Sequence, residues 1–298
     1  MPNPVISIAN QKGGVGKTTT TISLAACLGG QGKRVLIVDL DPQANATSGL
    51  GVDKEPGVSV LGPLMEEAEI GDRIKYTVFN NIYLLPSELD LCGAEIELCS
   101  KDNPSGQLDR VLAPLRESPD IDLILIDCPP SLGILTLNAF SASDWLIVPI
   151  QCEYYALEGI STLVHTLDQL KTNGVTSRLE LLGIVMTMFD GRTNLSNMVV
   201  DEVQKHFGNK VFDTVIPRST RIAEAPSHGK PITEYDGYNK GAAAYDVLAE
   251  EVAARVWGGG GDDSHQSSSE GSPSDSSESS SSSSRSNSDQ STTENNEE

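Results

Sequence analysis

The decisive stretch of this 298-residue chain is Lys12-Gly13-Gly14-Val15-Gly16-Lys17-Thr18-Thr19. The apolar run Val5-Ile6-Ser7-Ile8 before it predicts a buried parallel strand, and residues 18–28 after it predict a helix ended by Gly29-Gly30. A strand, a glycine-rich turn and a helix N-terminus together form an anion site. The first N–H groups of the helix have no intrahelical partner, and the helix dipole adds positive charge. The sequence therefore predicts a phosphate-binding loop.

The residue types in this loop indicate how a nucleotide would bind. The glycines let the backbone approach a phosphate closely. Lys17 would reach the β- and γ-phosphates, and the Thr18 hydroxyl would lie on Mg²⁺. The spacing differs from the ordinary P-loop, G-x-x-x-x-G-K-[ST], because Gln11 stands where that pattern has glycine and an extra lysine, Lys12, precedes the paired glycines.

The eight-residue string resembles the deviant Walker A box, K-G-G-x-G-K-[ST]-T, of the ParA/MinD family of ATPases. The resemblance implies that ATP and Mg²⁺ are the cofactors. It also implies that one continuous segment binds the nucleotide: Gln11, Lys12, Gly13, Gly14, Val15, Gly16, Lys17, Thr18 and Thr19.

Acidic residues end two further predicted strands. Asp39 and Asp41 flank Leu40 at the end of strand 34–39, and Asp127 ends the apolar strand 122–127. The carboxyl ends of parallel strands face the ligand crevice of an open α/β sheet. Four apolar residues followed by Asp127 match the Walker B pattern, which predicts that Asp127 holds Mg²⁺ through a water. By resemblance, Asp41 orients or activates the attacking water and Asp39 supports the Mg²⁺ shell.

Strands and helices alternate along the rest of residues 3–256. This alternation predicts an α/β fold with a mostly parallel, doubly wound sheet and helices on both faces. Besides those above, we expect strands at 82–87, 145–150, 179–188 and 211–216. We expect helices at 89–98, 107–115, 156–171, 194–207 and 241–256. Resemblance to ParA-type ATPases covers nearly all of this span, and the motif order places it near the chromosomal Soj branch.

The segment after the last strand is expected to cover the adenine in this family. Pro217 and Ser219 are therefore predicted nucleotide contacts, although Ser219 departs from the Asn or Asp that the family often has there. Arg192, Arg218 and Arg221 lie in segments that the family uses near its DNA surface. They are tentative DNA contacts, and solvated charges or ion-pair partners are an equal alternative.

The resemblance implies a nucleotide switch for chromosome or plasmid segregation. Lys12, Lys17 and Asp41 are the expected catalytic residues, with Lys12 crossing into a partner subunit to contact its ATP. The ATP-bound homodimer would bind DNA non-specifically, and a ParB-like centromere-binding activator would stimulate hydrolysis. An ATPase that positions a protein cargo stays open as an alternative, as does a MinD-like cell-division ATPase. The acidic chain end argues against membrane binding.

Composition narrows the function classes further. No run approaches the roughly 18 apolar residues of a membrane span, and the N-terminus lacks the regions of a signal peptide. We therefore expect a cytoplasmic, nucleoid-associated protein. Five cysteines form no C-x-x-C pair, which argues against a zinc or iron–sulfur site and favours buried thiols.

The net charge of −21 is unusual for a DNA-binding protein. Residues 258–298 hold nine acids and one arginine, and residues 1–257 still hold 33 acids and 20 bases. Both segments are therefore acidic, with net charges of −8 and −13 respectively. A salty cytoplasm, as in halophiles, is one explanation.

We expect two regions, an ATPase domain at 1–257 and a disordered acidic tail at 258–298. Seventeen of the 41 tail residues are serine, so the tail buries too little apolar surface to offset its ordering entropy. An inert solubilising tail, an autoinhibitory DNA mimic and a phosphorylation target all remain open.

Overall fold

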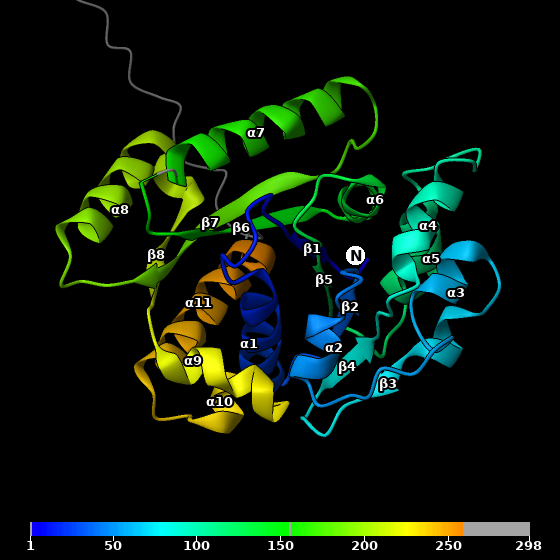
Figure 1. Cartoon of the computed structure of the whole chain (residues 1–298), viewed down its shortest axis with the longest axis horizontal. Coiled ribbons are helices and arrows are strands. Elements are labelled where there is room, and N and C mark those ends of the chain that lie inside the picture. Colours follow the sequence, from blue (N-terminus) through cyan, green and yellow to red (C-terminus); the bar gives the residue numbers. More distant parts are fainter. Residues whose placement is uncertain (1, 155, 259–298) are drawn as a thin grey trace, which may run out of the picture. The chain divides into compact units, whose positions relative to one another are not determined.

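The computed structural model describes residues 2–154 and 156–258, which contain one eight-stranded sheet (Figure 1). The sheet order is β3-β4-β2-β5-β1-β6-β7-β8. The strands are β1 Val5–Ile8, β2 Val35–Asp39, β3 Lys75–Tyr76, β4 Ile82–Leu85, β5 Leu123–Asp127, β6 Trp145–Gln151, β7 Glu180–Phe189 and β8 Val211–Pro217. Apart from Gly258, the predicted tail lies outside the described residues.

All neighbouring strands are parallel except β3 and β4, which pair antiparallel. The chain builds outward from β1 in both directions, because β5 pairs on one side of β1 and β6 on the other. Such a reversal opens a crevice at the carboxyl ends of the strands, where open α/β sheets bind ligands. The predicted doubly wound fold is confirmed, and the reversal lies where β1 runs into the glycine-rich loop.

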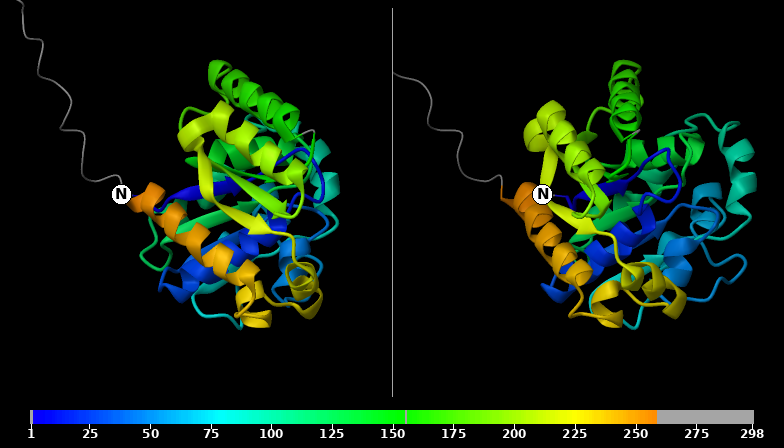
Figure 2. Two further views of the ribbon diagram at one scale, coloured as in Figure 1. Left: turned by 90° about the vertical axis from the view of Figure 1, so that its left-hand side faces the viewer. Right: turned by 60° about the vertical axis from the view of Figure 1, so that its left-hand side comes forward.

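Helices cover both faces of the sheet (Figures 1 and 2). One layer holds α1 Lys17–Gly30, α2 Asn45–Gly49, α9 Thr220–Glu224, α10 Ile232–Tyr235 and α11 Lys240–Trp257. The other holds α3 Leu61–Met65, α4 Leu91–Leu98, α5 Gln107–Arg116, α6 Ile134–Ala142, α7 Ala156–Thr172 and α8 Asn194–Phe207. Each layer has its own buried apolar core, because parallel strands are apolar on both faces.

The predicted strands and long helices are present, and the differences are local. The short strand β3 and the helices α2, α6, α9 and α10 were not predicted. Helix α1 includes Gly29 and ends at Gly30, so the predicted end at this glycine pair is confirmed to within two residues. A Cβ at position 29 would lie 2.8 Å from the Asn80 carbonyl oxygen, so glycine there permits close packing. The left-handed turn comes later, at Gly32 with φ +88°.

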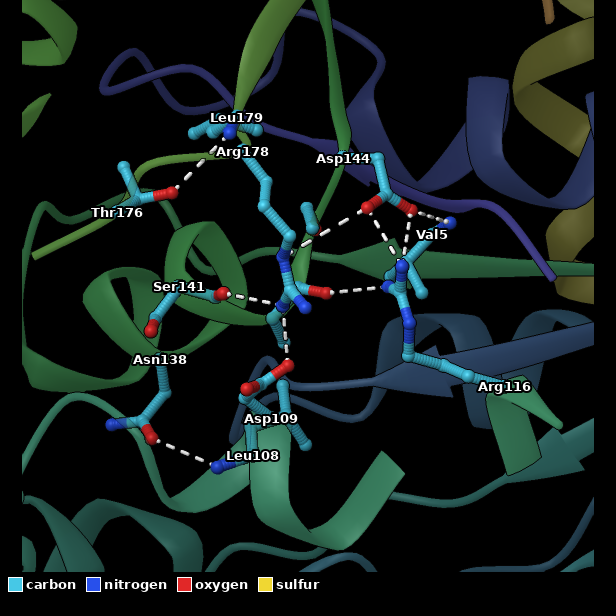
Figure 3. Close-up of polar contacts among 12 residues, drawn as sticks. Val5, Leu108, Asp109, Arg116, Asn138, Ser141, Asp144, Thr176, Arg178 and Leu179 are labelled. Atoms are coloured by element: carbon cyan, nitrogen blue, oxygen red, sulfur yellow. Dashed lines mark hydrogen bonds and ion pairs between the residues drawn. The ribbon is translucent and has the colours of Figure 1, made fainter. Parts of the chain in front are cut away.

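The strands are fastened together at their amino ends by an arginine–aspartate network (Figure 3). Asp144, just before β6, accepts 2.7 and 2.9 Å hydrogen bonds from the Arg116 Nη2 atom. It also accepts a 2.9 Å bond from the backbone N–H of Val5, which begins β1. Arg178 pairs with Asp109 and donates a 3.1 Å bond to the Ser141 carbonyl. This network lies at the end of the sheet opposite the crevice.

The cysteines divide into two groups. Cys27, Cys128 and Cys152 are buried, as expected, and burial raises their thiol pKa values. The expectation of buried thiols is wrong for Cys92 and Cys99, because they lie on the exposed side and just past the end of α4. None of the described helices combines the length and apolar composition of a bilayer span.

Candidate nucleotide site

The glycine-rich loop joins β1 to α1 at the centre of the crevice. Gly14 and Gly16 have φ values of +74° and +93°, a left-handed backbone that favours glycine. Gly16 is the N-cap of α1, and its carbonyl accepts a 2.8 Å bond from the Thr20 N–H. A Cβ at Gly13 or Gly14 would meet no atom within 4 Å. The loop therefore presents an open backbone surface at a helix N-terminus, as phosphate binding requires.

Neighbouring strands hold this loop in place through two side chains that the sequence analysis missed. Thr187 in β7 donates a 2.8 Å bond from Oγ1 to the Val15 carbonyl oxygen. Asn10 donates from Nδ2 to the Pro149 carbonyl in β6, and its Oδ1 accepts a 2.9 Å bond from the Lys12 N–H. The loop shape is thus tied to β6 and β7 as well as to its own glycines.

Lys17 brings a buried ammonium into the loop. Its Nζ lies 3.3 Å from the carbonyl oxygen of Lys12, within hydrogen-bond reach. Burial lowers the pKa of Lys17, while the nearby carboxylates of Asp127 and Asp41 oppose that shift. A positive charge held in this low-dielectric position interacts strongly with an anion that enters the loop.

Two aspartates end adjacent strands and face each other. Asp39 at the end of β2 is the register partner of Asp127 at the end of β5, and both are fully buried. Burial raises the pKa of both carboxyl groups, and the charge of the neighbouring acids raises it further. Two close buried carboxylates repel each other, so a cation placed here would be favoured.

Hydroxyl groups stabilise this acidic pair. Asp127 accepts a 2.7 Å bond from Thr18 Oγ1 and a 3.2 Å bond from Thr21 Oγ1. Asp39 accepts bonds of 2.7 Å from both the N–H and the Oγ1 of Thr47. Thr21 and Thr47 were not predicted, because threonines in a helix carry no distinctive pattern.

The third acid, Asp41, lines the cavity beside the loop. Its Oδ1 accepts a 2.9 Å bond from the Gln43 N–H, and its own N–H lies 3.3 Å from Asp39 Oδ1. The backbone of Asp41 is thus in contact with the Asp39 carboxylate, and support of the Mg²⁺ shell by Asp39 stays a prediction.

Two adjoining cavities occupy the crevice. One, of about 570 Å³, is lined by residues that include Gly13, Lys17, Thr18 and Asp41. The other, of about 360 Å³, is lined mainly by apolar groups and includes Pro217 and Ser219. Gly16, Thr19 and Met188 line both. Sizes of this order suit small-molecule sites. The cavity with Lys17 and the loop glycines suits phosphates, and the mainly apolar cavity suits a base.

The oxygen donors suit Mg²⁺ only in part. Thr18 and Asp127 offer hydroxyl and carboxylate oxygens, which hard cations prefer. Among the described residues, no three acidic, histidine or cysteine side chains are grouped so that they could hold a metal ion. Mg²⁺ is commonly held by one or two carboxylates plus substrate phosphates. These residues therefore fit an ion that arrives with a nucleotide.

Lys12 points away from the buried acids. Its Nζ forms a 2.6 Å ion pair with Glu153 Oε2, just beyond the end of β6, and about half of each side chain is exposed. Lys12 and Gln11 do not line either cavity. The side chain of Lys12 is thus available at the surface next to the loop.

The three predicted DNA-contact arginines are exposed but lie among acids. Arg192 donates hydrogen bonds of 2.8 and 2.7 Å to Asp190. These bonds, together with the nearby charge of Arg218, lower the pKa of Asp190 to about 2. Arg221 pairs with Glu224 at 3.2 Å and lies 3.6 Å from Asp236. Arg218 forms no ion pair with any described residue. The ion-pair alternative therefore applies to two of the three.

Comparisons with known proteins agree with this geometry. A family model described as an AAA domain matches residues 3–181. The sporulation initiation inhibitor protein Soj of Bacillus subtilis is 51% identical over 251 residues, covering 84% of this chain and 98% of that protein. The chromosome partitioning protein ParA of Myxococcus xanthus is 46% identical over 253 residues, covering 84% of this chain and 88% of that protein.

Solved structures give the same fold. The Mycobacterium smegmatis cobyrinic acid a,c-diamide synthase, with a bound ATP analog and magnesium, has a TM-score of 0.74 and 37% identity, covering 86% of this chain and 97% of that chain. The cell division ATPase MinD of Pyrococcus furiosus has a TM-score of 0.70 and 32% identity, covering 84% and 98% respectively. With its P-loop, paired acids and these similarities, the chain belongs to the ParA/Soj family of chromosome-partitioning ATPases.

Proposed function

We propose that this ATPase binds Mg²⁺–ATP in the two adjoining cavities and uses it as a switch for DNA segregation. The observation that carries the proposal is the pair of adjoining cavities, one lined by Lys17 and the loop glycines and the other, mainly apolar, by Pro217 and Ser219. Lys17 and the N–H groups of the loop would bind the phosphates. Thr18 and Asp127 would hold Mg²⁺, which would offset phosphate charge when bound.

Asp41 is the residue best placed to orient the attacking water. It lines the phosphate cavity, and the Gln43 N–H fixes one of its oxygens. Asp39 lies behind it and is fully buried, so its part is to support the shell of acids. In the reaction, water attacks the γ-phosphorus, and the bond from that phosphorus to the oxygen of ADP breaks.

Lys12 is our candidate for joining two chains. Its exposed side chain lies beside the loop and outside both cavities, so it can serve a nucleotide held by a second copy. ATP would then link two chains face to face, and hydrolysis would release them. The ATP-bound dimer would bind DNA non-specifically, and a ParB-like partner would stimulate hydrolysis. A cytoplasmic, nucleoid-associated location follows from that role.

Arg218 is the strongest of the three proposed DNA contacts. It is exposed and has no ion-pair partner among the described residues, whereas Arg192 and Arg221 are already paired with acids. Phosphate contacts weaken as salt rises. If the cytoplasm is as salty as the acidic composition predicts, DNA binding depends on bringing Arg218 of two chains together in the dimer.

DNA co-sedimentation tests this function. The Asp41→Ala protein, which should retain ATP, is spun with long DNA in ATP, ADP or no nucleotide across a range of KCl concentrations. We expect sedimentation with ATP alone and its loss in Arg218→Glu. Because Arg218 also lines the base cavity, ATP affinity is measured in parallel. Arg110→Glu, an exposed arginine of α5 that lies outside that cavity, is the matched control for the change in charge.

The result also separates the alternatives. An ATP-dependent dimer that ignores DNA at every KCl concentration would contradict DNA segregation and favour a protein cargo. Activity that peaks at low salt and collapses in molar KCl would contradict the salty cytoplasm.

A further inference from the structure

The ion pair between Lys12 and Glu153 joins segments that are far apart in the sequence. Lys12 lies in the glycine-rich loop after β1, and Glu153 lies just past the carboxyl end of β6. Their side-chain atoms are 2.6 Å apart, a distance typical of a charge-assisted hydrogen bond. About half of each side chain is exposed, so the pair is accessible and can open without rearranging the core.

The position of Glu153 is well defined by the strands beneath it. The N–H of Cys152 donates a 3.1 Å bond to the carbonyl of Thr187 in β7, and the N–H of Glu153 donates a 2.7 Å bond to Gln151. Thr187 in turn holds the Val15 carbonyl of the loop. Glu153 and the loop are therefore attached to the same pair of strands, which fixes the distance between them.

The backbone of Lys12 is held as well. Its N–H donates to Asn10 Oδ1, and its carbonyl oxygen lies 3.3 Å from Lys17 Nζ. Phosphates that enter the loop would compete for the Lys17 ammonium and so weaken this second contact. Neither backbone contact restrains the Lys12 side chain, whose ammonium is held by the Glu153 carboxylate.

We propose that Glu153 is a positioning residue that holds Lys12 against its own subunit and so raises the ATP concentration at which two chains join. The inference rests on the proposed role of Lys12 in the partner's site. A single Lys12 side chain cannot reach a partner's nucleotide while its ammonium is paired with Glu153 in its own chain. The free energy needed to open that pair therefore weakens dimerisation.

The size of the effect of Glu153 on dimerisation follows from the exposure of the Lys12–Glu153 ion pair. Exposed ion pairs contribute about 0.2–1 kcal/mol, equivalent to about 1.4- to 5-fold in an equilibrium constant. Two such pairs open when two chains join, so removing both should tighten dimerisation by about 2- to 25-fold. The effect should shrink as KCl rises, because salt screens exposed charges.

The test compares two proteins by sedimentation velocity across an ATP titration. One is the parent Asp41→Ala, and the other is the double variant that carries Glu153→Gln as well. We expect the Glu153→Gln protein to dimerise at lower protein and ATP concentrations in dilute KCl, with the difference fading towards molar KCl. Glu153→Asp keeps the charge and should stay near the parent. Glu180→Gln removes a comparable exposed ion pair, with Lys171, at the other end of the sheet and should change nothing.

Two outcomes are distinguishable. If the parent dimerises with ATP but Glu153→Gln dimerises equally or less well, the role of Glu153 is wrong and the proposed function stands. If the parent stays monomeric at all ATP concentrations, the proposed function itself fails. ATP affinity at protein concentrations too low for dimerisation should be the same in both proteins, because Glu153 lines neither cavity.

Discussion

The acidic residues at the two ends of the sheet lie in opposite charge environments. At the amino ends, Asp144 is matched by the Arg116 guanidinium and by a backbone N–H (Figure 3). At the carboxyl ends, Asp39 and Asp127 are fully buried, and no arginine or lysine of the described residues forms an ion pair with either. Lys17 supplies the nearest positive charge that acts on Asp127.

The difference shows which end is built for stability and which for a ligand. The partly buried Asp144 has both oxygens bonded to Arg116, so its charge is balanced within the chain. Asp39 and Asp127 are adjacent buried acids without such a partner, and their excess negative charge disfavours the folded apoprotein. Mg²⁺ that arrives with a nucleotide would supply the missing charge.

Removing the Lys17 ammonium at the carboxyl end should have the largest effect. We expect Lys17→Ala to weaken ATP binding by about 100-fold or more, because a buried charge-assisted contact to phosphate is lost. Isothermal titration calorimetry with Mg²⁺ measures this. Arg178→Ala, at the amino end, is the control and should leave ATP affinity unchanged; equal losses in both would contradict the contrast.

Matched Asp→Asn changes at the two ends should shift stability in opposite directions. Asp144→Asn should destabilise the protein by about 3 kcal/mol, because Arg116 is left largely buried without its partner. Asp127→Asn should stabilise the apoprotein by about 1 kcal/mol, because it removes repulsion with Asp39. Urea unfolding without nucleotide measures both. A loss of stability in Asp127→Asn would show that its charge is already compensated.

The carboxyl end should also make stability depend on pH. Burial raises the pKa values of Asp39 and Asp127, so the folded chain binds protons more tightly than the unfolded chain. The free energy of unfolding should therefore fall as pH rises above about 4, until both folded-state pKa values are passed. Compared with Asp127→Asn, the wild type should lose at least about 1 kcal/mol more across this window.

The fall in the free energy of unfolding with rising pH should become smaller when Mg²⁺ and ATP are present, because the ionised acids then have a counter-charge. Urea unfolding between pH 5 and pH 8.5, with and without Mg²⁺–ATP, measures it. If the free energy of unfolding depends on pH in the same way for the wild type and Asp127→Asn, the raised pKa of Asp127 is contradicted.

The smallest effect should come from the strand that holds the loop. Thr187→Val removes the hydroxyl that bonds to the Val15 carbonyl and keeps the side-chain shape. We expect ATP affinity to fall by about fivefold, equivalent to about 1 kcal/mol. Thr187→Ser keeps the hydroxyl and should restore most of the affinity; failure of this rescue would mean that packing and not the hydrogen bond matters.

The parts predictable from sequence are those encoded by short local patterns. The loop around Lys17 and the acids Asp39 and Asp127 stand at strand ends, so parallel pairing brings them together once the fold is known. Pro217 and Ser219 line the apolar cavity, where resemblance placed the base.

The missed features depend on contacts between distant segments. Thr187 is 172 residues from Val15, and Glu153 is 141 residues from Lys12. Neither residue carries a local pattern that would reveal its partner. The exposure of Cys92 likewise depends on which face of α4 meets the core, and a short helical segment specifies that face weakly.

The central claim is that ATP, bound at the carboxyl end, joins two chains through Lys12. Sedimentation velocity of Asp41→Ala, with and without the additional change Lys12→Ala, tests it most directly in the presence of Mg²⁺–ATP. We expect a dimer for Asp41→Ala and a monomer that still binds ATP for the double variant. A double variant that dimerises with ATP as readily as Asp41→Ala would contradict the claim.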